Sequence, residues 1–227
     1  HGRGAIHGDV ISKLLEKKGH EVQKEYYVND AGRQIDILTA SVYLRAIKIE
    51  DNIFPESAYR GEYIKEIAKN ANLQDAVNID DLFKSLPEDD EEKIDKIISH
   101  LKSASEKDWQ SIKKVSLESV LSTIEKDLED FGVTFDNWFL ESSLLGADSK
   151  IDAAVQQLNT NNLIDNRDGN IWFKSSDFGD DKDRVLIRAD GRQTYFASDV
   201  AYHKDKLDRG FDEIINIWAQ IFIISSK

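Results

Sequence analysis

The sequence predicts an α/β fold in which a frame of helices and strands is interrupted by a long, largely helical insertion. Three observations lead to this prediction. Residues 1–50 read as helix, strand, loop and helix; residues from about 53 to 158 read as charged helices; and later residues return to short strands and a helix. The 227 residues, 40% of them hydrophobic, suffice for one large domain or two modest ones.

The first 50 residues form the first part of the α/β frame. Apolar residues of the predicted first helix share one face, and Gly19 follows as a stop. This face consists of Ile6, Val10, Ile11, Leu14 and Leu15. Residues 20–28, HEVQKEYYV, predict a strand, and the turn-type NDAG leads into a second helix. The apolar stripe of that helix is Ile35, Leu38, Val42, Ala46 and Ile49.

Residues 51–160 predict the helical insertion. One stripe consists of Ile94, Ile97, Ile98 and Leu101. A second stripe consists of Leu117, Leu121, Ile124, Leu128 and Phe131, followed by Gly132. The acidic stretch PEDDEEKIDK suits the start of a solvated helix, because the positive end of the helix dipole favours carboxylates.

Residues 161–197 predict a β-hairpin return, because RDGN and ADGR are turn sequences between alternating runs. Ser198 is expected to open a helix that runs to about Arg209. The segment FDEIINIW is expected to be a buried strand of a parallel sheet. Residues 198–227 therefore re-enter the α/β frame.

Composition excludes several classes of protein. Cysteine is absent, which removes disulfides, thiolate metal sites and cysteine nucleophiles. The net charge of −13 opposes nonspecific binding to nucleic acid. No apolar run approaches the 18 or so residues of a membrane span, and no secretory leader is visible. We expect a cytoplasmic protein without membrane partners, and the absence of an initiating Met suggests an internal piece of a longer one.

The opening sequence HGRG is suited to phosphate binding. Glycines let a phosphate approach closely, and the free N–H groups and dipole of a helix N-terminus favour it. A histidine can donate a further hydrogen bond. On its own this signal is weak, and a glycine-rich start of a helix with a surface histidine remains the alternative.

Two long segments carry a resemblance to a known family. The stretch HGRGAIHGDVISKLLEKKGHEVQKEYYVNDAGRQID closely resembles the segment after the His-x-Gly-His signature of class I aminoacyl-tRNA synthetases of the arginyl type. The stretch GDDKDRVLIRADGRQTYFASDVAYHKDKLDRGFDEIINIW resembles the return of that family into its nucleotide-binding fold. FPESAYRGEYI and FDNWFLESSL also look like it, so the resemblance reaches Trp218.

The resemblance implies a partial Rossmann-like nucleotide-binding domain, interrupted by a largely helical connective insertion with short antiparallel strands. It implies activation of L-arginine by ATP to arginyl-adenylate, then transfer to the 3′ end of the cognate tRNA. Mg²⁺ would arrive with ATP, no tightly bound cofactor is implied, and the parent protein would be monomeric. Because His1 matches the second histidine of the signature, we expect a fragment without activity of its own.

The resemblance also assigns site residues. It places His1 at the ATP phosphates as the catalytic histidine, with Gly2 and Gly4 beside it; an unstructured terminal residue is the alternative for His1. It places Tyr195 and Asp199 at the arginine substrate. A spacing of four puts both on one side of the turn into a helix, and a carboxylate binds a guanidinium through two charge-assisted hydrogen bonds. Alternatively, Asp199 only complements the helix dipole beside Ser198.

A loop supplies the remaining candidates. Asn29, Asp30 and Gln34 match the family's adenosine or substrate loop, but their side chains could equally hold a turn. His203, one turn beyond Asp199, lies either behind the site or on the plain surface of the helix. No metal-ligand constellation is visible, and GDDKD reads as the approach to a hairpin.

The C-terminal tail departs from the family, which continues after INIW with Gly-Ala-Asp-His-His-Gly. Here AQIFIISSK follows. A one-base shift of reading frame explains Ala219, Gln220 and Ile221, and a divergent terminal strand is the alternative. Two other functions stay open: a noncatalytic paralogue that acts as a protein-interaction module, and a purely structural helical domain.

Overall fold

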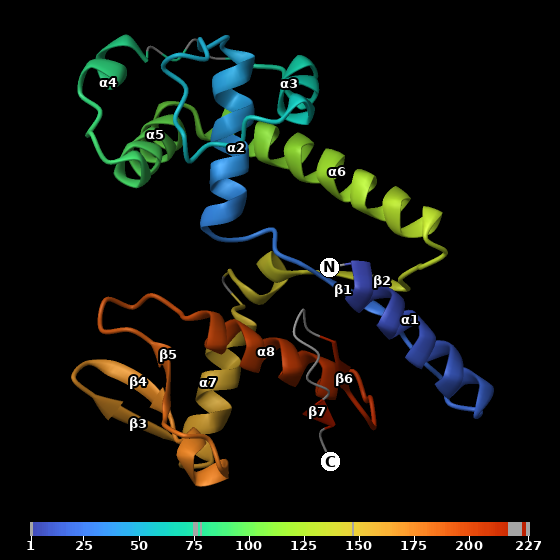
Figure 1. Cartoon of the computed structure of the whole chain (residues 1–227). Coiled ribbons are helices and arrows are strands. Elements are labelled where there is room, and N and C mark those ends of the chain that lie inside the picture. Colours follow the sequence, from blue (N-terminus) through green and yellow to red (C-terminus); the bar gives the residue numbers. More distant parts are fainter. Residues whose placement is uncertain (1, 75–76, 78, 147, 218–223, 226–227) are drawn as a thin grey trace. The chain divides into compact units, whose positions relative to one another are not determined.

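The computed structural model describes residues 2–74, 77, 79–146, 148–217 and 224–225, in two compact units (Figure 1). The first unit comprises His1–Val28 and Phe135–Lys227, and the second comprises Asn29–Thr134. Each unit has its own hydrophobic core. The predicted domain ranges follow the layout of the family rather than this division, and they stay predictions.

The first unit mixes helices with short strands. In chain order its elements are α1 (Gly2–Lys17), β1 (Glu25–Val28), β2 (Asn137–Leu140), η1 (Glu141–Leu144), α7 (Lys150–Thr160), β3 (Ile164–Arg167), β4 (Asn170–Phe173), η2 (Ser175–Phe178), β5 (Arg184–Ile187), α8 (Tyr195–Asp208), β6 (Ile215–Asn216) and β7 (Ile224–Ser225).

The strands β1 and β2 form a parallel pair, and the connection between them contains the whole second unit. Parallel strands need a long crossover, which is what the helical insertion provides. Aromatic residues stabilise the pair: the rings of Tyr26 and Trp138, which face each other in register, stack with their centroids 4.6 Å apart. The strand predicted for residues 20–28 is confirmed, but it is shorter than expected and begins only at Glu25.

The antiparallel sheet β3-β4-β5 contains the predicted RDGN turn, and the antiparallel bridge between Ile187 and Gln193 confirms the ADGR turn. Asp168 and Gly169 both have positive φ, at 50° and 76°, as a tight two-residue turn requires. In the ADGR turn, Arg188 N–H donates to the Arg192 carbonyl at 2.9 Å. This sheet and α7 pack on a core that α8 shares; its fully buried members include Leu144, Ile151, Leu186, Ala197 and Ala201.

The start of α8 corrects one prediction. The helix begins at Tyr195 and its N-cap is Thr194, whose hydroxyl oxygen accepts from Ala197 N–H at 3.3 Å. Thr194 takes this position because its own N–H donates to the Leu186 carbonyl at 3.0 Å, which fixes where the chain turns into the helix. Ser198 therefore lies buried inside the first turn, and its predicted role as a cap is wrong.

The strand β6 corrects a second prediction. It covers only Ile215–Asn216 and pairs antiparallel with β7, not within a parallel sheet. Ile215 is 38% exposed, so the strand is not buried as expected. Residues 218–223 lie outside the described part of the chain, and the explanation of the tail by a reading-frame shift stays a prediction.

The second unit is helical. Its elements are α2 (Arg33–Ala46), α3 (Glu62–Lys69), α4 (Asp80–Lys84), α5 (Asp90–Ala104) and α6 (Glu106–Asp130). The predicted stripe of α5 is buried throughout, at Ile94, Ile97, Ile98 and Leu101. The helix α2 is almost wholly buried among α3, α5 and α6, so it is the centre of this unit (Figure 1).

Two amphipathic helices are only partly covered. Ile6, Val10 and Leu14 of α1 are 41%, 48% and 61% exposed, although the helix itself forms as predicted. At the far end of α6, Phe131 is 69% exposed. None of the helices in the described residues is long and apolar enough to cross a membrane.

Candidate active site

The first turns of α8 present the two residues predicted to bind arginine. Tyr195 and Asp199 are four residues apart in this helix, so they lie on the same side of it. Tyr195 is 76% exposed, and Asp199 is also exposed. The hollows on α1 and beside α7 are lined by other residues. The shared cavity expected for the two side chains therefore stays a prediction.

The carboxylate of Asp199 is available for a ligand. Within the described residues, no side chain donates a hydrogen bond to it or pairs with it. Desolvation by the surrounding protein raises the pKa of Asp199, while the positive charge of Lys206 acts in the opposite direction. A cationic ligand would supply the partner that this carboxylate lacks in the described structure.

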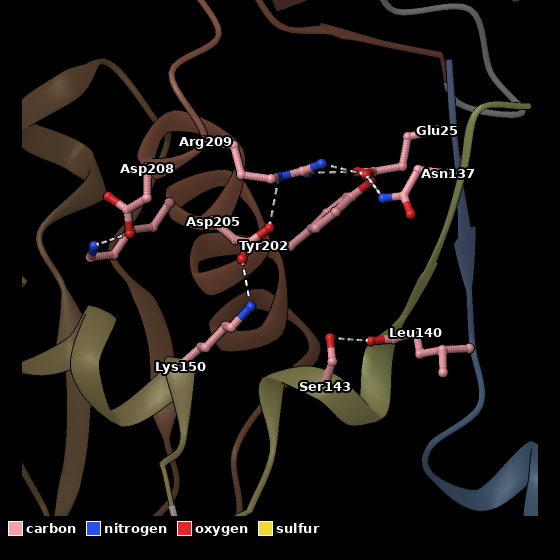
Figure 2. Close-up of polar contacts among 10 residues, drawn as sticks. Glu25, Asn137, Leu140, Ser143, Lys150, Tyr202, Asp205, Asp208 and Arg209 are labelled. Carbon is pink, nitrogen blue, oxygen red and sulfur yellow. Dashed lines mark hydrogen bonds and ion pairs between the residues drawn. The ribbon is translucent and has the colours of Figure 1, made fainter. Parts of the chain in front are cut away.

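A network around Glu25 holds α8 against the parallel strands (Figure 2). Arg209 donates from both terminal nitrogens to the Glu25 carboxylate, at 2.7 and 3.0 Å. Tyr202 donates its hydroxyl to Glu25 at 2.5 Å, and Asn137 of β2 donates its amide to the same carboxylate. The network therefore joins both strands to one helix.

Burial alone would raise the pKa of Glu25, but the hydrogen bonds from Arg209, Tyr202 and Asn137 outweigh it and lower that pKa. Burial, together with the bond to Glu25, raises the pKa of Tyr202 far above its usual value. Glu25 is thus held ionised and Tyr202 is held neutral. These are the states in which the Tyr202 hydroxyl donates and the Glu25 carboxylate accepts.

The same side of α8 is also tied to α7 (Figure 2). Lys150 pairs with Asp205 at 2.6 Å, and Asp205 also pairs with Arg209 Nε at 3.1 Å. One ion-pair chain thus runs from α7 through α8 to β1. Because most of its members are partly buried, these pairs hold position better than surface salt bridges do.

The predicted phosphate site is described only in part. His1 lies outside the described residues, and Gly2 and Gly4 lie in the first turn of α1. A Cβ at Gly2 would meet nothing within 4 Å, so the helix is open there, whereas one at Gly4 would contact the Ile217 side chain at 3.8 Å. Their contact with ATP phosphates stays a prediction.

The predicted substrate loop belongs to the second unit, whereas α8 belongs to the first. Asp30 is buried, with 4% exposure. Gln34 accepts from the Tyr59 hydroxyl at 2.6 Å, and Gly32 caps α2 with φ at 81°. These contacts show a local holding role for Gln34; a role of Asn29, Asp30 or Gln34 toward substrate stays a prediction.

The acidic GDDKD stretch is accounted for by ion pairs. Arg184 pairs with Asp180 at 2.5 Å and with Asp181 at 2.8 Å, and Arg167 pairs with Asp183 at 2.5 Å. Across the part of the chain that the structure describes, no group of three or more His, Cys, Asp or Glu side chains could hold a metal ion.

Two residues behind the site, Lys206 and Asn216, escaped the sequence analysis, which named only His203 there and left its role open. Lys206 and Asn216 contact each other, and Asn216 also contacts His203. The spacing from Asp199 pointed to His203, and it could also have pointed to Lys206, which lies seven positions further on the same helix. Nothing in the sequence could have pointed to Asn216, because the contact depends on how β6 folds back.

Comparisons with known proteins identify the family of this chain. The family model described as the catalytic domain of class I tRNA synthetases, arginine type, matches residues 1–221. The arginine–tRNA ligase of Acinetobacter baylyi is 43% identical over 243 residues, which cover 96% of this chain and 40% of that protein. The ligase of Psychrobacter cryohalolentis is 44% identical over 241 residues, with 96% and 39% covered.

Solved structures agree as well. A crystal structure from Campylobacter jejuni, described as an arginyl-tRNA synthetase, matches with a TM-score of 0.74 and 35% identity over 97% of this chain and 44% of that one. The Thermus thermophilus arginyl-tRNA synthetase shares the fold, with a TM-score of 0.59 at 20% identity over 100% and 37% of the two chains. The chain thus spans about 40% of the length of the curated relatives. Its fold and its sequence together place it in the family of class I tRNA synthetases of the arginine type, within the catalytic domain.

Proposed function

We propose that this chain is the catalytic-domain part of an arginine–tRNA ligase, which activates L-arginine with ATP and passes the arginyl group to its tRNA. The single observation that carries the proposal is the pair of side chains on α8. An exposed tyrosine and a carboxylate with no donor among the described residues stand on one side of the helix, in a chain of the arginine-type family.

The chemistry of the pair suits arginine. A guanidinium is planar and permanently charged, and it presents two parallel N–H groups to a carboxylate. Asp199 would accept both, and the Tyr195 ring would pack on the face of the same group. A lysine side chain offers a point charge without this geometry, so the pair would also discriminate between the two cationic amino acids.

The reaction needs little covalent chemistry from the protein. The carboxylate of arginine attacks the α-phosphate of ATP, pyrophosphate leaves, and the resulting adenylate is then attacked by a terminal hydroxyl of the tRNA. Gly2 and Gly4 in the first turn of α1 would bind the phosphates through N–H groups and the helix dipole, and His1 would add a further hydrogen bond. Mg²⁺ would arrive with ATP, and the protein would contribute positioning and charge stabilisation.

We also propose that the protein acts in the cytoplasm, as a monomer. The support for the location is the substrate set, since tRNA is charged where it is used. The interaction module considered above has no specific contact in its favour, whereas the tyrosine and carboxylate pair favours the ligase.

The proposal is tested by charging of tRNA. The complete gene product is purified and incubated with labelled arginine, ATP, Mg²⁺ and total tRNA from the same organism. We expect label in acid-precipitable tRNA, and no label when ATP or tRNA is omitted. A well-folded product that charges no tRNA with arginine would refute the proposal and leave the noncatalytic paralogue as the better interpretation.

A further inference from the structure

Behind Asp199, a row of polar side chains continues along the same face of α8. His203 and Lys206 follow Asp199 by four and seven positions, which is one turn and two turns of the helix. The side chain of Asn216, in β6, contacts both. The row therefore links the helix that carries the candidate arginine site to β6, the next strand along the chain.

The hydrogen bonds in this row have one consistent direction. Lys206 Nζ donates to Asn216 Oδ1 at 2.9 Å. Asn216 Nδ2 then donates to His203 Nε2 at 2.9 Å, and His203 Nδ1 lies 2.8 Å from the Asp199 carbonyl oxygen. Because Nε2 accepts, the imidazole must carry its proton on Nδ1 and be neutral.

Lys206 is an unusual member of the row, because it is a buried cation. Its exposure is 8%, and its ammonium lies 4.1 Å from the centroid of the Tyr202 ring. Burial lowers the pKa of Lys206 to about 8, against the charges of Glu25, Asp199 and Asp205, with Arg209 acting in the same direction as burial. Asn216 and Tyr202 therefore hold a charge that water no longer solvates.

We propose that Lys206, Asn216 and His203 form a positioning relay for Asp199: Lys206 provides positive charge behind the carboxylate, and the Asn216–His203 bond fixes the turn that carries it. The purpose of the relay rests on the proposed function. Positive charge at Lys206 favours the ionised form of Asp199, which opposes the desolvation of that carboxylate.

The test uses three variants of the complete gene product. Lys206→Met removes the charge at similar length, Lys206→Arg keeps it, and Lys204→Met is the matched control on the same helix. Lys204 pairs only with Asp208 among the described residues, at 2.5 Å. The arginine KM and the kcat of pyrophosphate exchange are measured between pH 6 and pH 8.5 for each variant.

We expect Lys206→Met to raise the arginine KM at least fivefold at pH 6 and less at pH 8.5, with kcat changed less than KM. Lys206→Arg should recover most of the loss, and Lys204→Met should match the wild type. The proposal is overturned if Lys206→Met leaves KM unchanged at every pH, or if it lowers kcat and raises KM equally at all pH values, as mere structural damage would.

A second measurement keeps the relay separable from the proposed function. The carboxyl ¹³C signal of Asp199 is titrated by NMR with and without Lys206→Met, and the ¹⁵N shifts of His203 report its tautomer. We expect a higher pKa for Asp199 in the variant and a proton on Nδ1 in the wild type. An unchanged Asp199 titration, or a proton on Nε2, would overturn the relay even if arginine is activated; absence of arginine activation would refute only the proposed function.

Discussion

Asp199 differs from the other carboxylates of α8 in what surrounds it. Asp205 pairs with Lys150 and Arg209, and Asp208 pairs with Lys204. In the described residues no comparable donor reaches the Asp199 carboxylate. This difference supports the proposed role of Asp199 toward a cationic ligand, whereas the neighbouring carboxylates pair with side chains that hold the helix.

Substitution of Asp199 should therefore cost arginine recognition. We expect Asp199→Ala in the complete gene product to lower kcat/KM for arginine. The expected loss of binding free energy in the transition state is roughly 2–4 kcal/mol, the scale for losing one partner of a charge pair. Asp199→Asn should also lose heavily, because an amide offers one acceptor oxygen instead of two. Steady-state pyrophosphate exchange checks this, with Asp208→Ala as the control. Near-normal kcat/KM in Asp199→Ala would favour the helix-dipole interpretation instead.

A second prediction at the scale of residues concerns Glu25. Its side chain is 10% exposed and accepts from Arg209, Tyr202 and Asn137. We expect Glu25→Gln to lower the free energy of unfolding by roughly 1–3 kcal/mol at pH 7, because one acceptor and the charge opposite Arg209 are lost. Chemical denaturation measures this, with the exposed Glu21→Gln as control.

The pH dependence of the same variant has a definite sign. The pKa of Glu25 is lowered in the folded protein, so its charge stabilises the fold above the unfolded pKa. That contribution is lost as the pH falls through the folded value. The stability difference between wild type and Glu25→Gln should therefore shrink in acid. A difference that is constant from pH 7 to pH 3 would contradict the network as described.

At the scale of elements, the start of α8 depends on one cap. Thr194 accepts from Ala197 N–H, and its hydroxyl lies 2.7 Å from the Val185 carbonyl, so it joins the end of β5 to the start of the helix. We expect Thr194→Ala to destabilise the protein by about 1 kcal/mol. Thr194→Ser should keep most of the stability that the cap provides, because serine is also a good capping residue. Thermal or urea unfolding measures both. If Ser198→Ala costs as much as Thr194→Ala, the cap has been assigned to the wrong residue.

Local signals in the sequence predicted the elements that local physics determines. The α5 stripe is buried as its spacing predicts, and the RDGN turn has the positive φ values that Asp168 and Gly169 tolerate. The cap of α8 was misassigned because Thr194 and Ser198 are both good capping residues. Only the backbone bond from Thr194 to Leu186, across the hairpin, decides between them.

The rest depends on contacts far apart in the chain. Glu25 and Arg209 are separated by 184 positions, and no periodicity links them. The parallel pairing of β1 with β2 likewise joins residues 112 positions apart. For the candidate site, the family resemblance pointed to Tyr195 and Asp199, but the relay behind Asp199 requires β6 to fold back onto α8, which short-range patterns do not encode.

At the scale of the whole molecule, the chain corresponds to about 40% of the length of its curated relatives. Transition-state stabilisation of a phosphate displacement requires all its donors in place together. We therefore expect the 227 residues alone to support no arginine-dependent exchange of pyrophosphate into ATP, while the complete gene product does. Robust exchange by the purified 227-residue chain would show that the described units already contain the full set of donors.

The most direct measurement is amino-acid-dependent exchange of labelled pyrophosphate into ATP by the complete gene product, with each of the standard amino acids in turn. Selection of a guanidinium by the Tyr195 and Asp199 pair predicts exchange with arginine alone, and none above background with lysine. Exchange with a different amino acid, or none with any of them from a folded protein, would contradict it.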